Sequence, residues 1–222
     1  MYYNRNDKEF IFIHIPKCGG TSIERSIIDG EHLEFERGCV HYFPRLKNNY
    51  PSIHPKHFKM YHYGKIMKEH LNDMFIFSMV RNPWDRMVSN YEYILRSPEI
   101  IFYDDKGNLR RDYEYKKTRI DFTSYIKDEF ERVKFNHTNV ITNSYEEYFV
   151  SKYRDGVDFV MKLENLAEDL PRLAGYLDME IPLLHENKSK NREHYCNYYN
   201  ADLKDKVYQK FKYEIHKYGY EF

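Results

Sequence analysis

The stretch that decides the fold is FIFIHIPKCGGTSIERSIIDG, residues 10–30, near the start of the chain. Its first part, residues 10–15, is apolar and rich in β-branched and aromatic side chains, which favours a buried strand. Further on, Ile23 and Ile27 lie one helical turn apart, and Gly30 stands where a helix would end. The stretch therefore predicts a strand, a glycine-containing turn and a helix, in that order.

The turn between this strand and this helix has the composition of an anion-binding site. A turn at a helix N-terminus presents unpaired backbone N–H groups that are aligned with the helix dipole. Gly19 and Gly20 leave the approach to those groups open, and Lys17 supplies a mobile positive charge. Thr21 and Ser22 add hydroxyl donors in the first helical turn. The pattern is not the GxxxxGK[ST] loop of nucleoside triphosphatases, because here the lysine precedes the glycines.

Two further apolar runs, residues 74–80 and 157–163, predict strands that share a sheet with the first one. Helical patterns follow each of them, and strands that alternate with helices are typical of a mostly parallel sheet. The sequence therefore predicts the α/β class, with a P-loop-like central parallel sheet flanked by helices.

The remaining predictions concern shorter or more polar segments. They are a strand at 59–62, a helix at 64–70, a helix from Pro83 to about Leu95, a polar loop at 97–119, a helix at 122–130, a helical segment at 164–177 with a first turn or a break at Pro171, and a last helix on which Leu203, Val207, Phe211 and Ile215 repeat every four residues.

Length and composition limit the possible classes of protein. With 222 residues, 41% of them hydrophobic, the chain suffices for one sizeable core, so we expect a single domain over residues 1–222. Lys plus Arg equals Asp plus Glu at 35 each, so no overall charge draws the chain to nucleic acid or to a membrane surface. Three cysteines without CxxC spacing predict free thiols and no zinc site. No stretch approaches the roughly 20 apolar residues of a membrane helix, and we expect a cytoplasmic protein.

A second motif, VRNPWDRMVSNY at residues 80–91, adds two more candidates for anion binding. Arg81 follows the predicted strand at 74–80, at the end where open α/β sheets place their ligands, and Ser89 lies two turns into the next helix. Arginine offers a planar fork that suits a phosphate, and serine offers a further donor. Taken alone, the pair is equally compatible with an ordinary surface arginine and a helix serine.

Together, IPKCGGTS and VRNPWDRMVSNY resemble the sulfotransferase superfamily, specifically its carbohydrate (Golgi-type, heparan- and chondroitin-like) sulfotransferases. In that family the first motif reads IPKTGGTS and the second reads VRNPxxRxVSxY. The likeness continues through MKLENLAEDLPRL, HENKSKNREHYCNYY and the final HKYGYEF, so it covers nearly the whole chain. One departure is Cys18, which stands where the family usually has threonine and is expected to be buried and inert.

The resemblance implies a nucleotide donor, 3'-phosphoadenosine 5'-phosphosulfate (PAPS), and no metal. It assigns the 5'-phosphosulfate to Pro16, Lys17, Cys18, Gly19, Gly20, Thr21 and Ser22, and the 3'-phosphate to Arg81 and Ser89. Ser189 and Lys190 match a C-terminal loop of the family that closes over the nucleotide, although such residues are equally compatible with a solvated charged loop. Two separated anion sites are what a nucleotide with phosphate groups at both ends of its ribose requires.

The implied reaction is an in-line displacement, in which positioning and charge stabilisation do most of the catalysis. Lys17 would neutralise charge on the departing phosphate oxygen. The acceptor hydroxyl must also lose a proton to a base, and the position of a family histidine points to His62, with His57 second and His54 third. Each is equally compatible with an ordinary structural histidine, and Glu24 and Glu34 are outside candidates.

The resemblance implies an oligosaccharide or polysaccharide acceptor, but other functions stay open. The segment at 104–119 holds six basic residues and would suit an anionic polysaccharide, or would simply be a polar loop. One alternative function is a catalytically silent relative that only binds the nucleotide. Another is a P-loop kinase that uses ATP, although the chain lacks the lysine pattern of that class.

Overall fold

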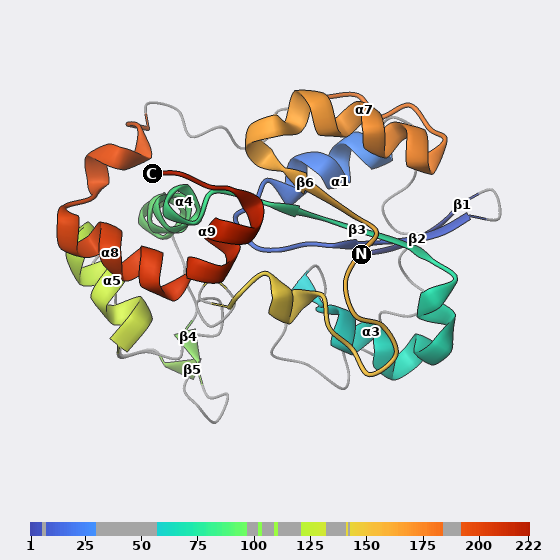
Figure 1. Ribbon diagram of the computed structural model, residues 1–222, viewed down its shortest axis with the longest axis horizontal. Coiled ribbons are helices and arrows are strands. Elements are labelled where there is room, and N and C mark those ends of the chain that lie inside the picture. The colour runs from blue at the N-terminus through green and yellow to red at the C-terminus, as the bar shows by residue number, and fades with distance from the viewer. Residues whose placement is uncertain are drawn as a thin grey trace. The chain divides into compact units, whose positions relative to one another are not determined.

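The computed structural model describes residues 1–5, 8–29, 57–96, 102–103, 109–110, 121–131, 141, 143–183 and 192–222 (Figure 1). Backbone contacts divide the chain into two compact units. The first comprises Met1–Arg81 with Tyr145–Lys190, and the second comprises Asn82–Ser144 with Asn191–Phe222. The single domain expected over residues 1–222 stays a prediction.

The first unit is built on a sheet with the order β1-β2-β3-β6. Its strands are β1 (Tyr2–Arg5), β2 (Lys8–Ile13), β3 (Phe75–Val80) and β6 (Phe159–Lys162). β2 pairs with β3 and β3 with β6 in parallel, whereas β1 runs antiparallel to β2. The predicted α/β class with a mostly parallel central sheet is confirmed, and β1 is an addition that the polar start of the chain did not suggest.

Helices cover both faces of this sheet (Figure 1). α1 (Gly20–Asp29) and α7 (Leu166–Leu177) lie on one face, and α3 (Met60–Met67) lies on the other. Short 3-10 turns at Lys68–Asn72, Glu146–Tyr148 and Leu163–Asn165 complete the unit. A cluster of buried side chains joins α1 and α7 to the sheet and includes Phe12, Ile23, Ile27, Phe77, Met161, Leu170 and Leu173. Because β3 is central in the sheet and nearly all buried, its sequence is apolar without alternation.

The second unit is mostly helical. Its elements are α4 (Pro83–Arg96), β4 (Phe102–Tyr103), β5 (Leu109–Arg110), α5 (Phe122–Glu131), a 3-10 turn at Tyr195–Tyr198, α8 (Ala201–Lys210) and α9 (Lys212–Tyr218). Asn82 caps α4 as expected, since its Oδ1 accepts the backbone N–H of Trp84 at 3.0 Å. Trp84 is buried, stacks on Tyr208 and donates its indole N–H to the Lys204 oxygen at 3.0 Å.

Three of the local predictions were wrong. Residues 60–62 begin helix α3 and do not form a strand, because the His62 side chain accepts the Lys59 backbone N–H and closes a helix-capping turn. α7 continues through Pro171, although proline lacks the N–H of a normal helical bond. The last helix is divided into α8 and α9, because the backbone of the buried Phe211 leaves the helical conformation at φ −115° and ψ 25°.

Candidate functional site

The glycine turn of the first unit joins the end of β2 to the start of α1. Its backbone has positive φ at two positions, 66° at Lys17 and 84° at Gly19. For a residue with a side chain this left-handed conformation costs about 1–2 kcal/mol, so the surrounding structure must hold Lys17 in place. Cys18, between the two, is fully buried with a free thiol. The turn thus holds the charged Lys17 in a backbone conformation that a residue with a side chain rarely adopts.

The two glycines of the turn are required for different reasons. At Gly19, the positive φ disfavours any side chain, and a Cβ would also lie 2.8 Å from atoms of Leu163 and Met79. At Gly20 the obstacle is the imidazole of His14, because a Cβ would lie 2.5 Å from its Nε2. Both glycines are therefore required by close packing against neighbouring side chains, and the binding of a ligand at this turn stays a prediction.

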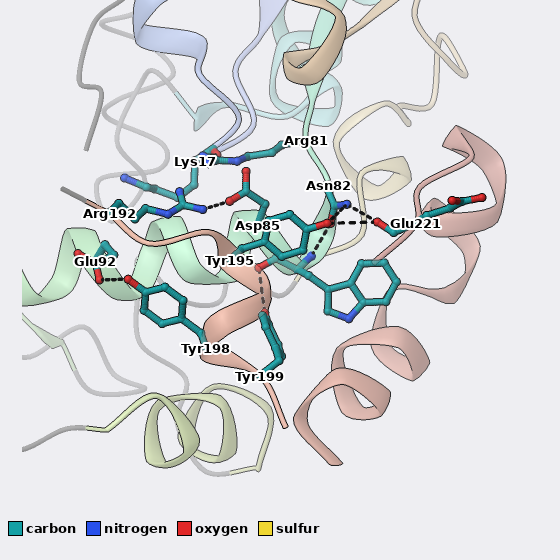
Figure 2. A network of polar contacts seen from close by, with 11 residues as sticks. Lys17, Arg81, Asn82, Asp85, Glu92, Arg192, Tyr195, Tyr198, Tyr199 and Glu221 are labelled. Carbon is teal, nitrogen blue, oxygen red and sulfur yellow. Dashed lines mark hydrogen bonds and ion pairs between the residues drawn. The ribbon is translucent and has the colours of Figure 1, made fainter. Parts of the chain in front are cut away.

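The Arg81 side chain connects the end of β3 to this turn. Its Nη1 donates a hydrogen bond to the main-chain oxygen of Lys17 at 3.1 Å, within the first unit (Figure 2). The oxygen of Arg81 in turn accepts the hydroxyl of the buried Tyr145. A guanidinium has five N–H donors in a planar fork, and this contact uses one of them. Two cationic residues from separate motifs are thus brought together at the carboxyl ends of two parallel strands.

A buried polar pair lies directly behind the turn. Nδ1 of His14 is 2.6 Å from Oε1 of Glu24, and the two residues are only 4% and 2% exposed. His14 follows strand β2, and Glu24 lies one helical turn after Gly20 on α1. The pair therefore joins the strand to the helix on either side of the glycine turn.

His57 and His62 occupy different environments in the same unit. Nδ1 of His57 is 3.2 Å from the main-chain oxygen of His14, and the two imidazoles meet edge to face with 4.8 Å between centroids. His62 is buried, and its Nδ1 accepts the Lys59 N–H at 2.8 Å. Burial lowers the pKa of His62 to about 4. The hydrogen bonds of the two residues therefore impose opposite tautomers, and a role as the base stays a prediction for both.

In the second unit, α4 carries Ser89 at a half-buried position. Asp85, in the first turn of this helix, forms an ion pair with Arg192 (Figure 2). One turn beyond Ser89, Glu92 accepts the hydroxyl of Tyr198 at 2.7 Å. Burial and this hydrogen bond raise the pKa of Tyr198 to about 12, so its hydroxyl stays protonated near neutral pH. α4 is thereby fixed to the segment that begins at Arg192.

Several predicted candidates lie outside the described residues. They are Ser189 and Lys190 of the C-terminal loop, His54 and Glu34 among the bases, and most of the basic segment at 104–119. Within the described ranges, no group of three or more His, Cys, Asp and Glu side chains is arranged to hold a metal ion. In the same ranges, no helix is long and apolar enough to cross a membrane.

Three residues of the site were missed or misjudged from the sequence. His14 was not considered, and Glu24 was considered only as a base. The four-residue spacing of Gly20 and Glu24 would have placed both on one face of α1, which is a signal that Glu24 lies beside the turn. The third residue, Tyr145, reaches Arg81 from 64 positions away, and no local pattern indicates such a contact.

The fold is that of an α/β protein whose glycine turn follows the carboxyl end of a parallel strand. The chain belongs to the sulfotransferase family, whose family model matches residues 2–221. Among solved structures, it is similar in fold to mouse sulfotransferase SULT7A1 complexed with PAP, with 14% sequence identity and a TM-score of 0.51. That match covers 96% of this chain and 85% of the mouse chain. No curated protein matches the sequence significantly.

Proposed function

We propose that the protein transfers a sulfuryl group from PAPS to a hydroxyl group of a carbohydrate acceptor by in-line displacement. The observation that carries the proposal is the strained Lys17 turn with Arg81 hydrogen-bonded to it, in a chain of the sulfotransferase family. The mouse relative in fold is described as complexed with PAP, which supports a nucleotide with 3'- and 5'-phosphate groups. The proposal thus adds a donor, an acceptor class and named residues to the family assignment.

The 5'-phosphosulfate would bind at the turn before α1. Its oxygens would accept backbone N–H groups of the turn, and the half-exposed Thr21 and the adjacent Ser22 would add hydroxyl donors. The ammonium of Lys17 would stabilise charge that develops on the phosphate oxygen as the sulfuryl group departs. Pro16, which has no backbone N–H, and Cys18, whose side chain is buried, would only shape the turn.

The 3'-phosphate would be bound by Arg81 and Ser89. Arg81 donates to the oxygen of Lys17, so its guanidinium, a group whose planar fork suits a phosphate, is held beside the turn. Ser89 would provide a hydroxyl donor from α4. An arginine held in this way loses less conformational entropy on binding than one that is mobile in solvent.

For the base that accepts the acceptor's proton, the hydrogen bonds favour His57 over His62. A carbonyl oxygen can only accept, so the contact of Nδ1 of His57 with the His14 oxygen places the ring proton on Nδ1 and makes Nε2 the basic nitrogen. In His62 the basic nitrogen is Nδ1, and it already accepts the Lys59 N–H. A pKa near 4 further weakens His62 as a base at neutral pH.

The first test is calorimetric titration with 3',5'-diphosphoadenosine, with AMP and ATP as controls. Micromolar binding that requires the 3'-phosphate, and that weakens by about 10-fold or more in Arg81→Ala and Lys17→Ala, would support the proposal. A preference for ATP would instead favour the kinase alternative. Equal binding of AMP and 3',5'-diphosphoadenosine would overturn the assignment of Arg81.

The second test separates an enzyme from a silent relative. Radiolabelled PAPS is incubated with a panel of oligosaccharide and polysaccharide acceptors, and the label transferred to sugar is measured. Transfer that is lost in Lys17→Ala supports the sulfotransferase reaction, whereas tight nucleotide binding without transfer to any acceptor favours the silent relative. The same panel tests the proposed carbohydrate acceptor, and localisation of the native protein tests the proposed cytoplasmic location.

A further inference from the structure

The buried pair of His14 and Glu24 has no part in the reaction as proposed above. It lies behind the turn in the first unit, with 2.6 Å between Nδ1 and Oε1. Replacing both partners of a buried hydrogen bond with apolar side chains can be nearly neutral for stability, so the presence of this pair in a core is not explained by stability alone. Its location beside Gly20 suggests a role in the turn.

The geometry limits how the turn and the imidazole of His14 can move. The ring occupies the space where a Cβ of residue 20 would be, with its Nε2 2.5 Å from that point. Glu24 fixes the ring from the opposite nitrogen, and it does so from α1, the helix whose N-terminus forms the anion site. The ring is therefore packed directly against Gly20 on one side and hydrogen-bonded to Glu24 on the other.

The same residue also contacts the proposed base. Nδ1 of His57 is 3.2 Å from the main-chain oxygen of His14, and the two rings meet edge to face. His14 consequently contacts the turn through its side chain and His57 through its ring and its backbone. One buried residue thus lies between the donor-binding backbone and the candidate base.

We propose that His14, oriented by Glu24, is a positioning residue that holds the Gly19–Gly20 turn in the shape that binds the donor. The inference rests on the proposed function, because it assumes that the turn binds the 5'-phosphosulfate. Glu24 acts as the hydrogen-bond acceptor that fixes the ring, and not as the base that deprotonates the acceptor. Displacement of reacting or binding groups by about 1 Å can cost about 100-fold in rate, so such a residue affects function without touching substrate.

The experiment measures the dissociation constant of 3',5'-diphosphoadenosine by calorimetry in variants of this pair. Glu24→Ala and His14→Ala should each weaken binding by about 10-fold or more, because the ring is no longer held behind Gly20. Glu24→Gln keeps an oxygen that accepts from Nδ1 and should bind within about 3-fold of wild type. If the charge of Glu24 were required, glutamine would not restore binding.

A matched control separates positioning from loss of stability. Asp169 is also a buried carboxylate of the first unit, on α7, and accepts the Lys162 N–H at 2.9 Å. Asp169→Ala should lower the melting temperature and leave the dissociation constant unchanged. Should Asp169→Ala weaken binding as much as Glu24→Ala, or Glu24→Gln bind as weakly as Glu24→Ala, the proposal is wrong.

Variants at Gly20 keep the proposal testable if Glu24→Ala does not fold. Gly20→Ala should weaken nucleotide binding, because its methyl group meets the His14 ring. In the double variant with His14→Ala, the dissociation constant should rise by less than the product of the two single fold-changes. Fully independent effects would contradict a shared contact. If the wild-type protein does not bind 3',5'-diphosphoadenosine, the proposed function fails and this inference fails with it. If the wild-type protein binds the nucleotide and the variants bind it equally well, this inference is wrong and the proposed function is unaffected.

Discussion

The main-chain oxygen of His14 accepts a hydrogen bond from Nδ1 of His57, with 3.2 Å between the two atoms. The residue that follows strand β2 thereby sets the tautomer of a histidine 43 positions further along the chain. Because a tautomer determines which nitrogen can take a proton, this contact distinguishes His57 from His62.

His57→Gln should lower kcat by about 100-fold or more at saturating donor, because the acceptor hydroxyl loses its base. Affinity for 3',5'-diphosphoadenosine should change little, since the proposed role begins only when the acceptor is bound. Initial rates with a sulfated-product assay and calorimetry with the nucleotide measure the two effects separately.

The matched variant is His62→Gln, at the histidine that the sequence favoured. We expect it to retain most of the wild-type kcat, because Nδ1 of His62 is engaged by the Lys59 N–H. A loss of kcat in His62→Gln with an unaffected His57→Gln would reverse the assignment and restore His62 as the base.

His62 also predicts how stability depends on pH. Its pKa is about 4 in the folded chain against 6.5 in the unfolded chain, because burial disfavours the charged ring. Above pH 6.5 the ring is neutral in both states, and its full contribution to the free energy of unfolding is present. As the pH falls from 6.5 to about 4, the unfolded chain takes up a proton that the folded chain does not. The free energy of unfolding should therefore decrease by up to about 3 kcal/mol over that interval.

Urea unfolding at a series of pH values measures this effect. His62→Gln removes the titrating group, so its free energy of unfolding should vary less across the same interval than that of wild type. A parallel pH dependence in the two proteins would show that other groups cause the acid destabilisation.

Lys17 is expected to oppose stability while it supports activity. Its φ of 66° lies in the left-handed region, which glycine adopts without cost. Lys17→Gly should raise the free energy of unfolding by about 1 kcal/mol relative to Lys17→Ala, which retains the strain. Both variants lack the ammonium group and should lose sulfuryl transfer to a similar extent. Equal stability of the two variants would show that the backbone at residue 17 relaxes.

Two helical glycines should respond in opposite directions to the same substitution. Gly20→Ala should destabilise the protein by about 1–3 kcal/mol, because its methyl group overlaps the His14 ring. At Gly175, inside α7, an added methyl group would meet no neighbouring side chain or segment within 4 Å, and Gly175→Ala should stabilise by about 0.5–1 kcal/mol. Thermal unfolding of the two variants tests this difference, and destabilisation by Gly175→Ala would contradict it.

The parts of the structure that the sequence predicted well depend on neighbouring residues. The turn at Lys17 and Gly19 was predicted because a strand, a turn and a helix follow each other within residues 10–30, and each has its own local pattern. The start of α4 was likewise evident from Asn82 and the proline that follows it. In such segments, backbone preference and burial favour the same structure.

What the sequence did not predict depends on contacts between distant segments. The hydrogen bond from Arg81 to the Lys17 oxygen and the hydroxyl of Tyr145 on the Arg81 oxygen join residues 64 positions apart. Residues 60–62 look like a strand from composition, yet the side-chain bond to Lys59 closes a helical turn there. Pattern reasoning also did not detect the interruption at Phe211, because the four-residue repeat of apolar side chains continues across it.

Trp84, buried in the second unit with its indole N–H on the Lys204 oxygen, is the one tryptophan of the chain. Because Trp84 belongs to the second unit, its fluorescence reports on the packing of that unit around α4. Far-ultraviolet circular dichroism samples the backbone of both units. The two signals will follow the same denaturation curve only if the units unfold cooperatively. A single indole thus provides a probe of coupling between the units that requires no substitution and no bound nucleotide.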